Sequence, residues 1–275
     1  LFTNGILLGS VYALIGVGLS LVFGIVGITN LAHGEFVILG AYASTFLASA
    51  WGVDPIVTLV VTVPFMFVLG YLLQSTLLNH AMDRGSEPTL LVTFRLSIIL
   101  QDAMLLAFSV DAQHTPSPYA SAIIALGDLE ISALNIVLFA ISICCVCLLT
   151  LFLHKTYLGR AIRAVSDDQE VAMLSGINVH RVYAVAMGIS MATAAVAGLC
   201  VGMKWTFYPS SGGQYLLTAF IVVVLGGLGS IPGTLLAGLA FGMAQVFGGA
   251  NYGLMISYIA MLAVLAIRPH RSNGH

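Results

Sequence analysis

The sequence predicts an all-α polytopic membrane protein, and both its composition and its patterning point to that class. Of its 275 residues, 59% are hydrophobic and only 7% are charged, whereas a typical soluble domain has about 25% charged residues. So few charges could not cover the surface of a soluble protein, which excludes a soluble enzyme, a nucleic-acid-binding protein and a disordered chain. The apolar residues come in long runs and do not alternate with polar ones, which excludes an outer-membrane β-barrel. We treat the chain as one transmembrane domain, residues 1–275.

Several apolar runs are candidates for membrane-spanning helices, each of which needs ~20 mostly apolar residues. In chain order they are 5–27, 35–51, 56–79, 89–109, 134–154, 183–205, 214–230, 233–249 and 251–267. The runs 214–230 and 233–249 are short and are separated by a turn rich in Gly and Pro, so each is a candidate for a broken or re-entrant helix. We expect eight or nine crossings, together with one short helix on the cytoplasmic side.

The positions of Lys and Arg predict the orientation, because these residues are enriched in cytoplasmic loops. Alternating the sides along nine segments places most of the basic residues on one face: Arg84, Lys155, Arg160, Arg163, Arg181, Arg268 and Arg271. The opposite face has one basic residue, Lys204, and carries Asp54, Asp111, Asp128 and Glu130. We therefore expect the N-terminus outside, the C-terminus in the cytoplasm, and nine crossings in preference to eight.

The segment Asn30-Leu31-Ala32-His33-Gly34-Glu35 places polar residues between two strongly apolar runs, with no long loop. A histidine and a carboxylate at the edge of a membrane usually face a cavity, a partner or a water path, because contact with lipid is costly. One interpretation makes four of these residues candidates for a translocation pathway or gate: Asn30, His33, Gly34 and Glu35. The alternative is a plain interfacial turn, in which Asn30 caps the next helix and Glu35 is favoured in its first turn.

The interval 155–182 holds seven of the chain's charges and is its longest polar stretch. Within it, Ser166-Asp167-Asp168-Gln169 has the form of a capping box, and Ser175-Gly176 is a typical helix stop. These signals predict a cytoplasmic helix of about nine residues, which is too short to be stable in water without a surface to pack on. We interpret it as a docking element, and the alternative is a solvated loop with one incidental turn of helix. The candidate docking residues are Arg160, Arg163, Ser166, Asp167, Asp168, Gln169, Glu170, Leu174 and Gly176.

A glycine-rich stretch, residues 225–233, predicts a break between two spanning segments. Its turn-forming residues are Gly226, Gly227, Gly229, Pro232 and Gly233. Glycine-rich loops also bind nucleotides, but a P-loop requires a Gly-Lys-Ser/Thr sequence, and this stretch has no lysine. We therefore expect no ATP-hydrolysing site in this chain.

Three polar residues lie inside the predicted helix 89–109, namely Arg95, Gln101 and Asp102. Arg95 and Asp102 are seven residues apart, nearly two helical turns, so they lie on one face of the helix. A rise of ~10.5 Å between them argues against direct contact. We expect a buried structural relationship, mediated by Gln101 or by a neighbouring helix, that spares each group an unpaired charge.

Enzyme and metal motifs are not found in the sequence. It contains no G-x-S-x-G or H-E-x-x-H motif, and no paired acidic motif lies inside a predicted span. The four cysteines, at positions 144, 145, 147 and 200, lack metal-ligand spacing. We therefore expect no catalytic residue, no metal site and no disulfide.

Several blocks along the chain are distinctive in combination: Gly9-Ser10-Val11-Tyr12-Ala13-Leu14-Ile15, the segment Asn30 to Glu35, Leu158-Gly159-Arg160-Ala161-Ile162-Arg163-Ala164, and Val224 to Gly233. In this order they closely resemble the permease family of bacterial branched-chain amino-acid ABC importers, and the resemblance reaches across nearly the whole chain. It implies an ABC importer permease fold in the bacterial inner (plasma) membrane, surrounded by lipid.

The resemblance also implies partners. Such permeases pair with a second, similar permease, bind two cytoplasmic ATPases and receive a small-molecule solute from a periplasmic binding protein. ATP and Mg²⁺ are then bound by the ATPases, and this chain carries no cofactor and contacts no nucleic acid. The family's ATPase-coupling loop matches residues 158–178, where charge and capping signals independently predict a docking helix. The implied solutes are branched-chain or other hydrophobic amino acids, although the family also serves urea, amides and aromatic compounds.

Two other classes remain as alternatives. The chain could act alone as an ion-coupled secondary transporter, with His33 and Glu35 as the proton relay. It could also be a scaffold subunit that only anchors its partners.

Overall fold

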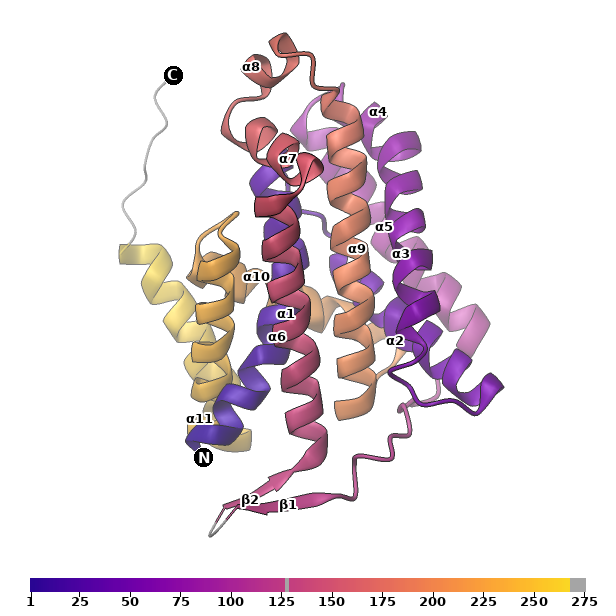
Figure 1. Ribbon diagram of the computed structural model, residues 1–275, viewed down its shortest axis with the longest axis vertical. Coiled ribbons are helices and arrows are strands. Elements are labelled where there is room, and N and C mark those ends of the chain that lie inside the picture. The colour runs from indigo at the N-terminus through magenta and orange to yellow at the C-terminus, as the bar shows by residue number, and fades with distance from the viewer. Residues whose placement is uncertain (127–128, 268–275) are drawn as a thin grey trace.

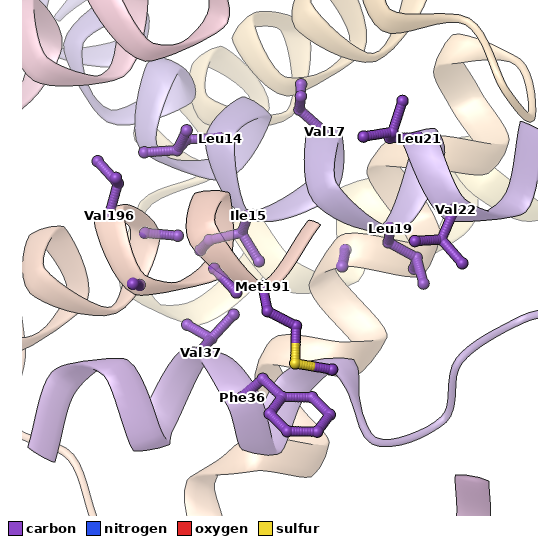
Figure 2. Close-up of a cluster of buried hydrophobic side chains, with 14 of the residues drawn as sticks. Leu14, Ile15, Val17, Leu19, Leu21, Val22, Phe36, Val37, Met191 and Val196 are labelled. Atoms are coloured by element: carbon purple, nitrogen blue, oxygen red, sulfur yellow. The ribbon is translucent and has the colours of Figure 1, made fainter. Parts of the chain in front are cut away.

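Two buried helices, α1 (Phe2–Val26) and α9 (Val179–Lys204), form the centre of a helical bundle in the computed structural model (Figure 1). The structure describes residues 1–126 and 129–267. Both helices are apolar around their whole circumference, which is typical of a helix enclosed by other helices. Figure 2 shows their contacts with α2 (His33–Trp51) in the core. The side chains labelled there are Leu14, Ile15, Val17, Leu19, Leu21, Val22, Phe36, Val37, Met191 and Val196.

The other helices surround this centre. α3 (Leu59–Leu73) continues through a π-helical turn, η1 (Gln74–Leu78), into α4 (Asn79–Met82). The remaining elements are α5 (Ser86–Phe108), α6 (Ala133–Lys155), α7 (Tyr157–Asp167), α8 (Gln169–Leu174), the 3-10 turn η2 (Pro209–Ser211), α10 (Gly212–Gly226) and α11 (Ile231–Ile267). α7 and α8 lie at one end of the bundle, which we call the α8 end (Figure 1).

The predicted spans agree with the observed helices. In the described part of the chain, seven helices are long and apolar enough to cross a membrane. α2 follows the predicted run 35–51, and α11 covers the last two predicted runs, with a sharp bend at Gly249 (φ 64°, ψ −172°) between them. The structure is therefore consistent with the expected eight or nine crossings.

The interval between α5 and α6 corrects the all-α prediction in one detail. It contains a two-stranded antiparallel hairpin, β1 (Ile123–Leu126) and β2 (Leu129–Ser132), in which Ile123 pairs with Ser132. The hairpin lies at the opposite end of the bundle from α8 (Figure 1), and we call this the hairpin end. No signal for this hairpin is recognisable in the sequence, because two four-residue strands show too little alternation to identify it.

Close backbone contact joins α1 to the first part of α11. A Cβ atom added at Gly238 would lie 2.4 Å from the Cα of Ala13, and one added at Gly242 would lie 2.3 Å from the Cα of Gly9. Small residues permit this approach and provide van der Waals contact where lipid offers no hydrophobic driving force for association. The two helices therefore depend on these glycines for their packing.

Gly242→Val should force α11 away from α1 and destabilise the protein by about 1–3 kcal/mol, the usual cost of overpacking. Gly213→Ala is a matched control, because an added Cβ there meets no atom within 4 Å. We expect the thermal unfolding midpoint of the purified protein to fall for Gly242→Val only. Equal midpoints for the two variants would contradict the packing argument.

Two helices begin inside the bundle and not at its ends. His33, the first residue of α2, lies with Nε2 2.9 Å from the carbonyl oxygen of Ile15, near the middle of α1. Gly34 packs on the first turn of α10, since a Cβ added there would lie 1.9 Å from the carbonyl oxygen of Gly212. α10 then runs about 22 Å towards the α8 end. The N-termini of α2 and α10 therefore meet at mid-bundle, and the run 214–230 forms a short helix that starts inside the bundle.

Candidate functional site

The segment 30–35 is buried and does not form a turn at the membrane surface. Asn30, His33 and Glu35 are each 4% exposed or less. Asn30 accepts a hydrogen bond from the Ala32 backbone N–H through Oδ1 (3.1 Å) and lies 3.8 Å from the sulfur of Met187 through Nδ2. The helix itself has no side-chain cap. This geometry disagrees with the interfacial-turn interpretation, in which Asn30 caps the helix at the water boundary.

His33 acts as a link between helices. Because a carbonyl oxygen only accepts, the Nε2 atom carries the proton and donates to Ile15 of α1. Its ring also packs against Gly18, where an added Cβ would lie 3.0 Å from Cε1. The ring therefore packs on α1, and its hydrogen bond to Ile15 holds the start of α2 against the middle of α1.

Glu35 joins three helices at mid-bundle. Its Oε1 atom accepts a hydrogen bond from the Ser97 hydroxyl of α5 at 3.0 Å. Its Oε2 atom has no hydrogen-bond partner among the described residues and lies against Gly212, where an added Cβ would be 1.3 Å away. A buried oxygen without a partner is costly, but the N-terminus of α10 carries a partial positive charge that favours a carboxylate there. The arrangement couples the position of α2 to those of α5 and α10.

Glu35→Gln should weaken this junction, because an amide N–H₂ group would then compete with the N-terminal N–H groups of α10. We expect a loss of about 1 kcal/mol in stability, measured as a lower thermal unfolding midpoint of the purified protein. Glu87→Gln is the matched control, because Glu87 also lies in the first turn of a helix but is exposed. Similar unfolding midpoints for both variants would show that Glu35 contributes only as an ordinary first-turn acid.

The polar residues of α5 lie differently from the prediction. Arg95 and Asp102 are exposed and Gln101 is half-buried, so the expected buried relationship is wrong within this chain. Among the described residues the one ion pair joins His180 and Asp83, and neither Arg95 nor Asp102 takes part in it. Lipid cannot cover two charged groups in the interior of a spanning helix at low cost, so this face of α5 requires water or another protein.

α7 and α8 form the polar feature at the α8 end. α7 is amphipathic and buries Gly159, Ala161, Ile162 and Val165 against the bundle, a helix that the sequence signals missed. Its exposed face carries Arg160 and Arg163. The available signal was the helical spacing of these four small or aliphatic residues within the eleven residues of α7. That spacing places them on one face of a helix.

The N-cap that the capping box predicts for α8, Ser166, is wrong by two positions. Ser166 and Asp167 lie in the last turn of α7, and Ser166 donates to the carbonyl of Gly24 at the end of α1. The N-cap is Asp168, whose Oδ1 accepts from the N–H groups of Glu170 (2.9 Å) and Val171 (3.0 Å). An Asp carboxylate that accepts two donors satisfies the helix start directly. α8 therefore has six residues, not about nine.

The predicted stop of α8 is confirmed. Gly176 has a φ of +83°, a left-handed conformation that favours glycine and ends a helix. Gln169 and Glu170 are exposed on the first turn of α8, and Leu174 at its end is 88% exposed. An apolar side chain so open to solvent gives α8 a free contact surface.

The glycine-rich turn also lies at the α8 end. Gly227 and Gly229 have φ values of 95° and 81°, and Pro232 is the second residue of α11. Gly226 and Gly233 close the turn, because a Cβ added at Gly233 would lie 1.9 Å from the Gly226 carbonyl oxygen. The predicted break is therefore confirmed as a tight turn between α10 and α11.

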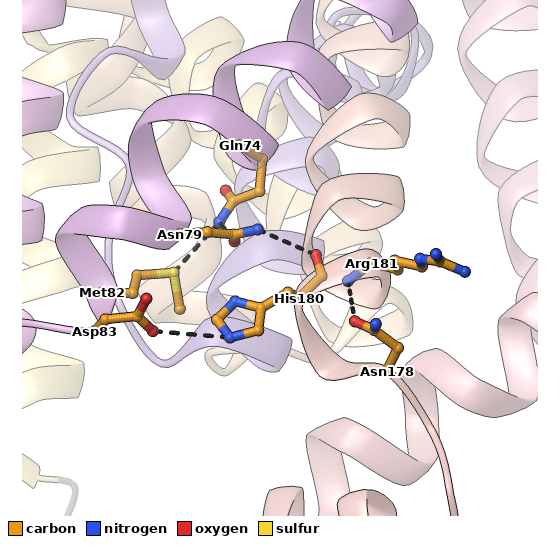
Figure 3. Close-up of polar contacts among 7 residues, drawn as sticks. All are labelled: Gln74, Asn79, Met82, Asp83, Asn178, His180 and Arg181. Atoms are coloured by element: carbon orange, nitrogen blue, oxygen red, sulfur yellow. Dashed lines mark hydrogen bonds and ion pairs between the residues drawn. The ribbon is translucent and has the colours of Figure 1, made fainter.

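Polar contacts also tie α4 to the start of α9, next to α8 (Figure 3). Asn178 caps α9 by accepting from the Arg181 N–H at 3.0 Å. Asn79 donates to the His180 carbonyl at 3.4 Å, and the His180 ring lies 3.7 Å from the Asp83 carboxylate. π-helical turns inside α-helices frequently occur at functional sites, and η1 directly precedes these contacts.

The structure thus defines a polytopic permease domain in which broken helices meet at mid-bundle and an exposed short helix lies at one end. A family model described as branched-chain amino acid transport system, permease component, matches residues 1–265. The chain belongs to this family, and the expected ABC importer permease fold is confirmed. An ion-coupled secondary transporter is accordingly not favoured.

Individual relatives agree with this assignment. The chain is 33% identical to the high-affinity branched-chain amino acid transport system permease protein BraD of Pseudomonas aeruginosa, over 97% of this chain and 92% of BraD. It is 31% identical to the corresponding protein LivH of Escherichia coli (strain K12), with the same coverage. Among solved structures, PsaBC from Streptococcus pneumoniae in complex with Fab resembles it with a TM-score of 0.54 and 11% identity, over 97% of this chain and 91% of that one. This last likeness concerns the fold alone.

Proposed function

We propose that this chain is the translocation subunit of an ATP-driven importer for branched-chain or other hydrophobic amino acids. The names of its relatives support this solute class. The observation that carries the mechanism is the exposed helix α8, which is capped by Asp168 and presents Leu174 to solvent. In a chain with so few charges and so little surface outside the membrane, this helix is the natural contact for a cytoplasmic ATPase.

The docking surface consists of α7, α8 and their flanking turns. Val171, Met173 and Leu174 are 57%, 49% and 88% exposed, and Arg160 and Arg163 lie beside them on α7. Apolar anchors with charged neighbours are typical of a protein–protein contact. The ATPases bind ATP and Mg²⁺, and this chain supplies the surface that moves with them.

Two contacts carry that movement into the membrane. The Ser166 hydroxyl holds α7 to the Gly24 carbonyl of α1, and Gly24 in turn packs on Gly229 of the α10–α11 turn, where an added Cβ would lie 2.7 Å from its Cα. α1 and α10 both reach the mid-bundle junction around Glu35. A shift of α8 can therefore bias two arrangements of the half-helices, as alternating access requires.

A second, homologous permease covers the exposed face of α5. Arg95 and Asp102 stand on that face without an ion-pair partner in the described structure, and a charged face inside a membrane needs a protein or aqueous neighbour. The solute path then runs between the two permeases, and the periplasmic binding protein delivers solute at the hairpin end. In this proposed arrangement the N-terminus lies outside and the α8 end lies in the cytoplasm of a bacterial inner membrane.

Asp168→Ala removes the cap of α8 at a cost of about 1 kcal/mol and should uncouple the docking helix. Asp168→Asn is the matched control, because Asn caps as well as Asp. We expect solute-stimulated ATP hydrolysis by the reconstituted complex to fall at least fivefold for Asp168→Ala and to stay near wild type for Asp168→Asn. The same preparations are assayed for ATP-dependent uptake of L-leucine.

Three outcomes would contradict the proposal. Normal coupling in Asp168→Ala would remove α8 from the mechanism. Equal losses in Asp168→Asn would assign the effect to charge and not to the cap. Uptake by this chain alone along an ion gradient, without ATPases, would favour a secondary transporter.

A further inference from the structure

A polar cavity of about 560 Å³ lies between α1, α10, α11 and the segment 205–211. Its walls include Tyr12, Trp205, Tyr208, Gln214, Tyr215 and Gln245. Among the described residues that line it, none is Asp, Glu, Lys, Arg or His. The volume lies within the range of about 300–1,000 Å³ that small-molecule sites have.

The position of this cavity makes its polar lining informative. Tyr12 and Gln245 belong to α1 and to the first part of α11, both long and apolar enough to span a membrane. Hydroxyl and amide groups at such a depth are stable only where they are paired or line a wet space. Another cavity of about 610 Å³, lined by residues such as Leu148, Phe152 and Ile189, is apolar and has no such requirement.

The polar groups of the cavity are oriented by hydrogen bonds and ring stacking. The Tyr12 hydroxyl donates to Gln245 Oε1 at 2.5 Å. The Tyr12 ring stacks on Trp205 with centroids 5.8 Å apart and meets Phe241 edge-on at 4.9 Å. The Gln245 amide nitrogen donates to no described residue, and the Tyr12 oxygen keeps its acceptor capacity. Both groups are therefore available to a ligand.

The wall formed by residues 205–211 is held in place by contacts on the side away from the cavity. Phe207 and Gln113 exchange backbone hydrogen bonds of 2.9 and 3.0 Å, and the Phe207 ring packs edge-on against Tyr42 of α2. The Tyr208 N–H donates to the Ser211 hydroxyl at 3.0 Å. At the rim, the positive φ of Gly249 bends α11. The cavity is thus bounded by constrained backbone.

We propose that this cavity is a binding site for a small solute of no net charge, either zwitterionic or neutral, whose apolar part packs on the aromatic walls. Hydrogen-bonding groups of the solute contact the Tyr12 hydroxyl and the Gln245 amide. A solute with net charge would leave that charge unpaired, because the lining offers no counter-charge. The inference rests on the proposed function in taking an amino acid as the natural ligand, but it concerns a site of this chain and not of the binding protein.

The test measures solute binding to the purified permease–ATPase complex in lipid nanodiscs, without the binding protein. Radiolabelled L-leucine is the zwitterionic probe and N-acetyl-leucinamide the neutral one, with L-lysine and L-glutamate as charged competitors. We expect saturable binding of the uncharged class, with competition by the charged amino acids at least tenfold weaker.

Variants locate the site. Tyr12→Phe and Gln245→Leu should each weaken binding about tenfold, since each removes a group that contacts the solute. Tyr183→Phe is the control, because Tyr183 is a buried tyrosine of α9 that does not line the cavity. Binding is measured only on complexes that elute as intact assemblies in size-exclusion chromatography. The two cavity variants are tested separately, so that one of them still tests the site if the other fails to assemble.

The outcomes separate this inference from the proposed function. Failure of both uncharged probes to bind, equal competition by L-lysine or L-glutamate, or unchanged binding in the assembled cavity variants would each overturn the cavity site. A wild-type complex that binds L-leucine in the cavity, but shows no leucine-stimulated ATP hydrolysis with its binding protein, would contradict the proposed function and leave the cavity site intact.

Discussion

The contact between the first turns of α2 and α10 is the constraint on which the rest of this structure depends. Gly34 and Gly212 allow two helix N-termini to approach until backbone meets backbone, and Glu35 places a carboxylate beside the partial positive charge of α10. Half-helices that meet inside a membrane leave unpaired backbone groups, which are tolerated only where protein or a cavity surrounds them. The tightly packed helices α1 and α9 surround the N-termini of α2 and α10. The short helices can therefore start inside the bundle only because α1 and α9 are buried beside them.

The sequence predicts the helices well because the membrane imposes a simple rule. Any run of about twenty apolar residues must be helical to satisfy its own backbone, so the spans could be located without knowledge of their neighbours. The position of α2 could not, because nothing in residues 30–35 states that His33 lies beside Ile15 in mid-bundle. Long-range contacts such as that between Glu35 and Ser97 depend on how the helices pack. A single sequence, considered without an alignment, shows no pattern from which that packing can be predicted.

The errors in the site prediction have a common cause. A local sequence motif does not show which tertiary contacts its residues make, and those contacts decided the outcome. Ser166 fits a capping box, but α7 continues through it because its apolar face is buried, and the Asp168 carboxylate then caps the next helix with two hydrogen bonds. Arg95 and Asp102 share one face as their spacing requires, but that face points away from the chain. Spacing fixes which residues share a face, and only tertiary structure decides what the face meets.

Besides the mid-bundle junction around Glu35, three regions that carry charged or polar groups differ in their surroundings. The α8 end carries exposed charges, which we propose face a cytoplasmic ATPase, and the exposed face of α5 carries two that require a protein or aqueous neighbour. The cavity beside Tyr12 is polar but uncharged, since a fixed charge there would have to be neutralised each time a solute left. Hydrogen bonds and aromatic rings bind a solute without that cost. A transporter needs such moderate affinity, because a site that holds its solute tightly in one state must give up that free energy to release it in the next.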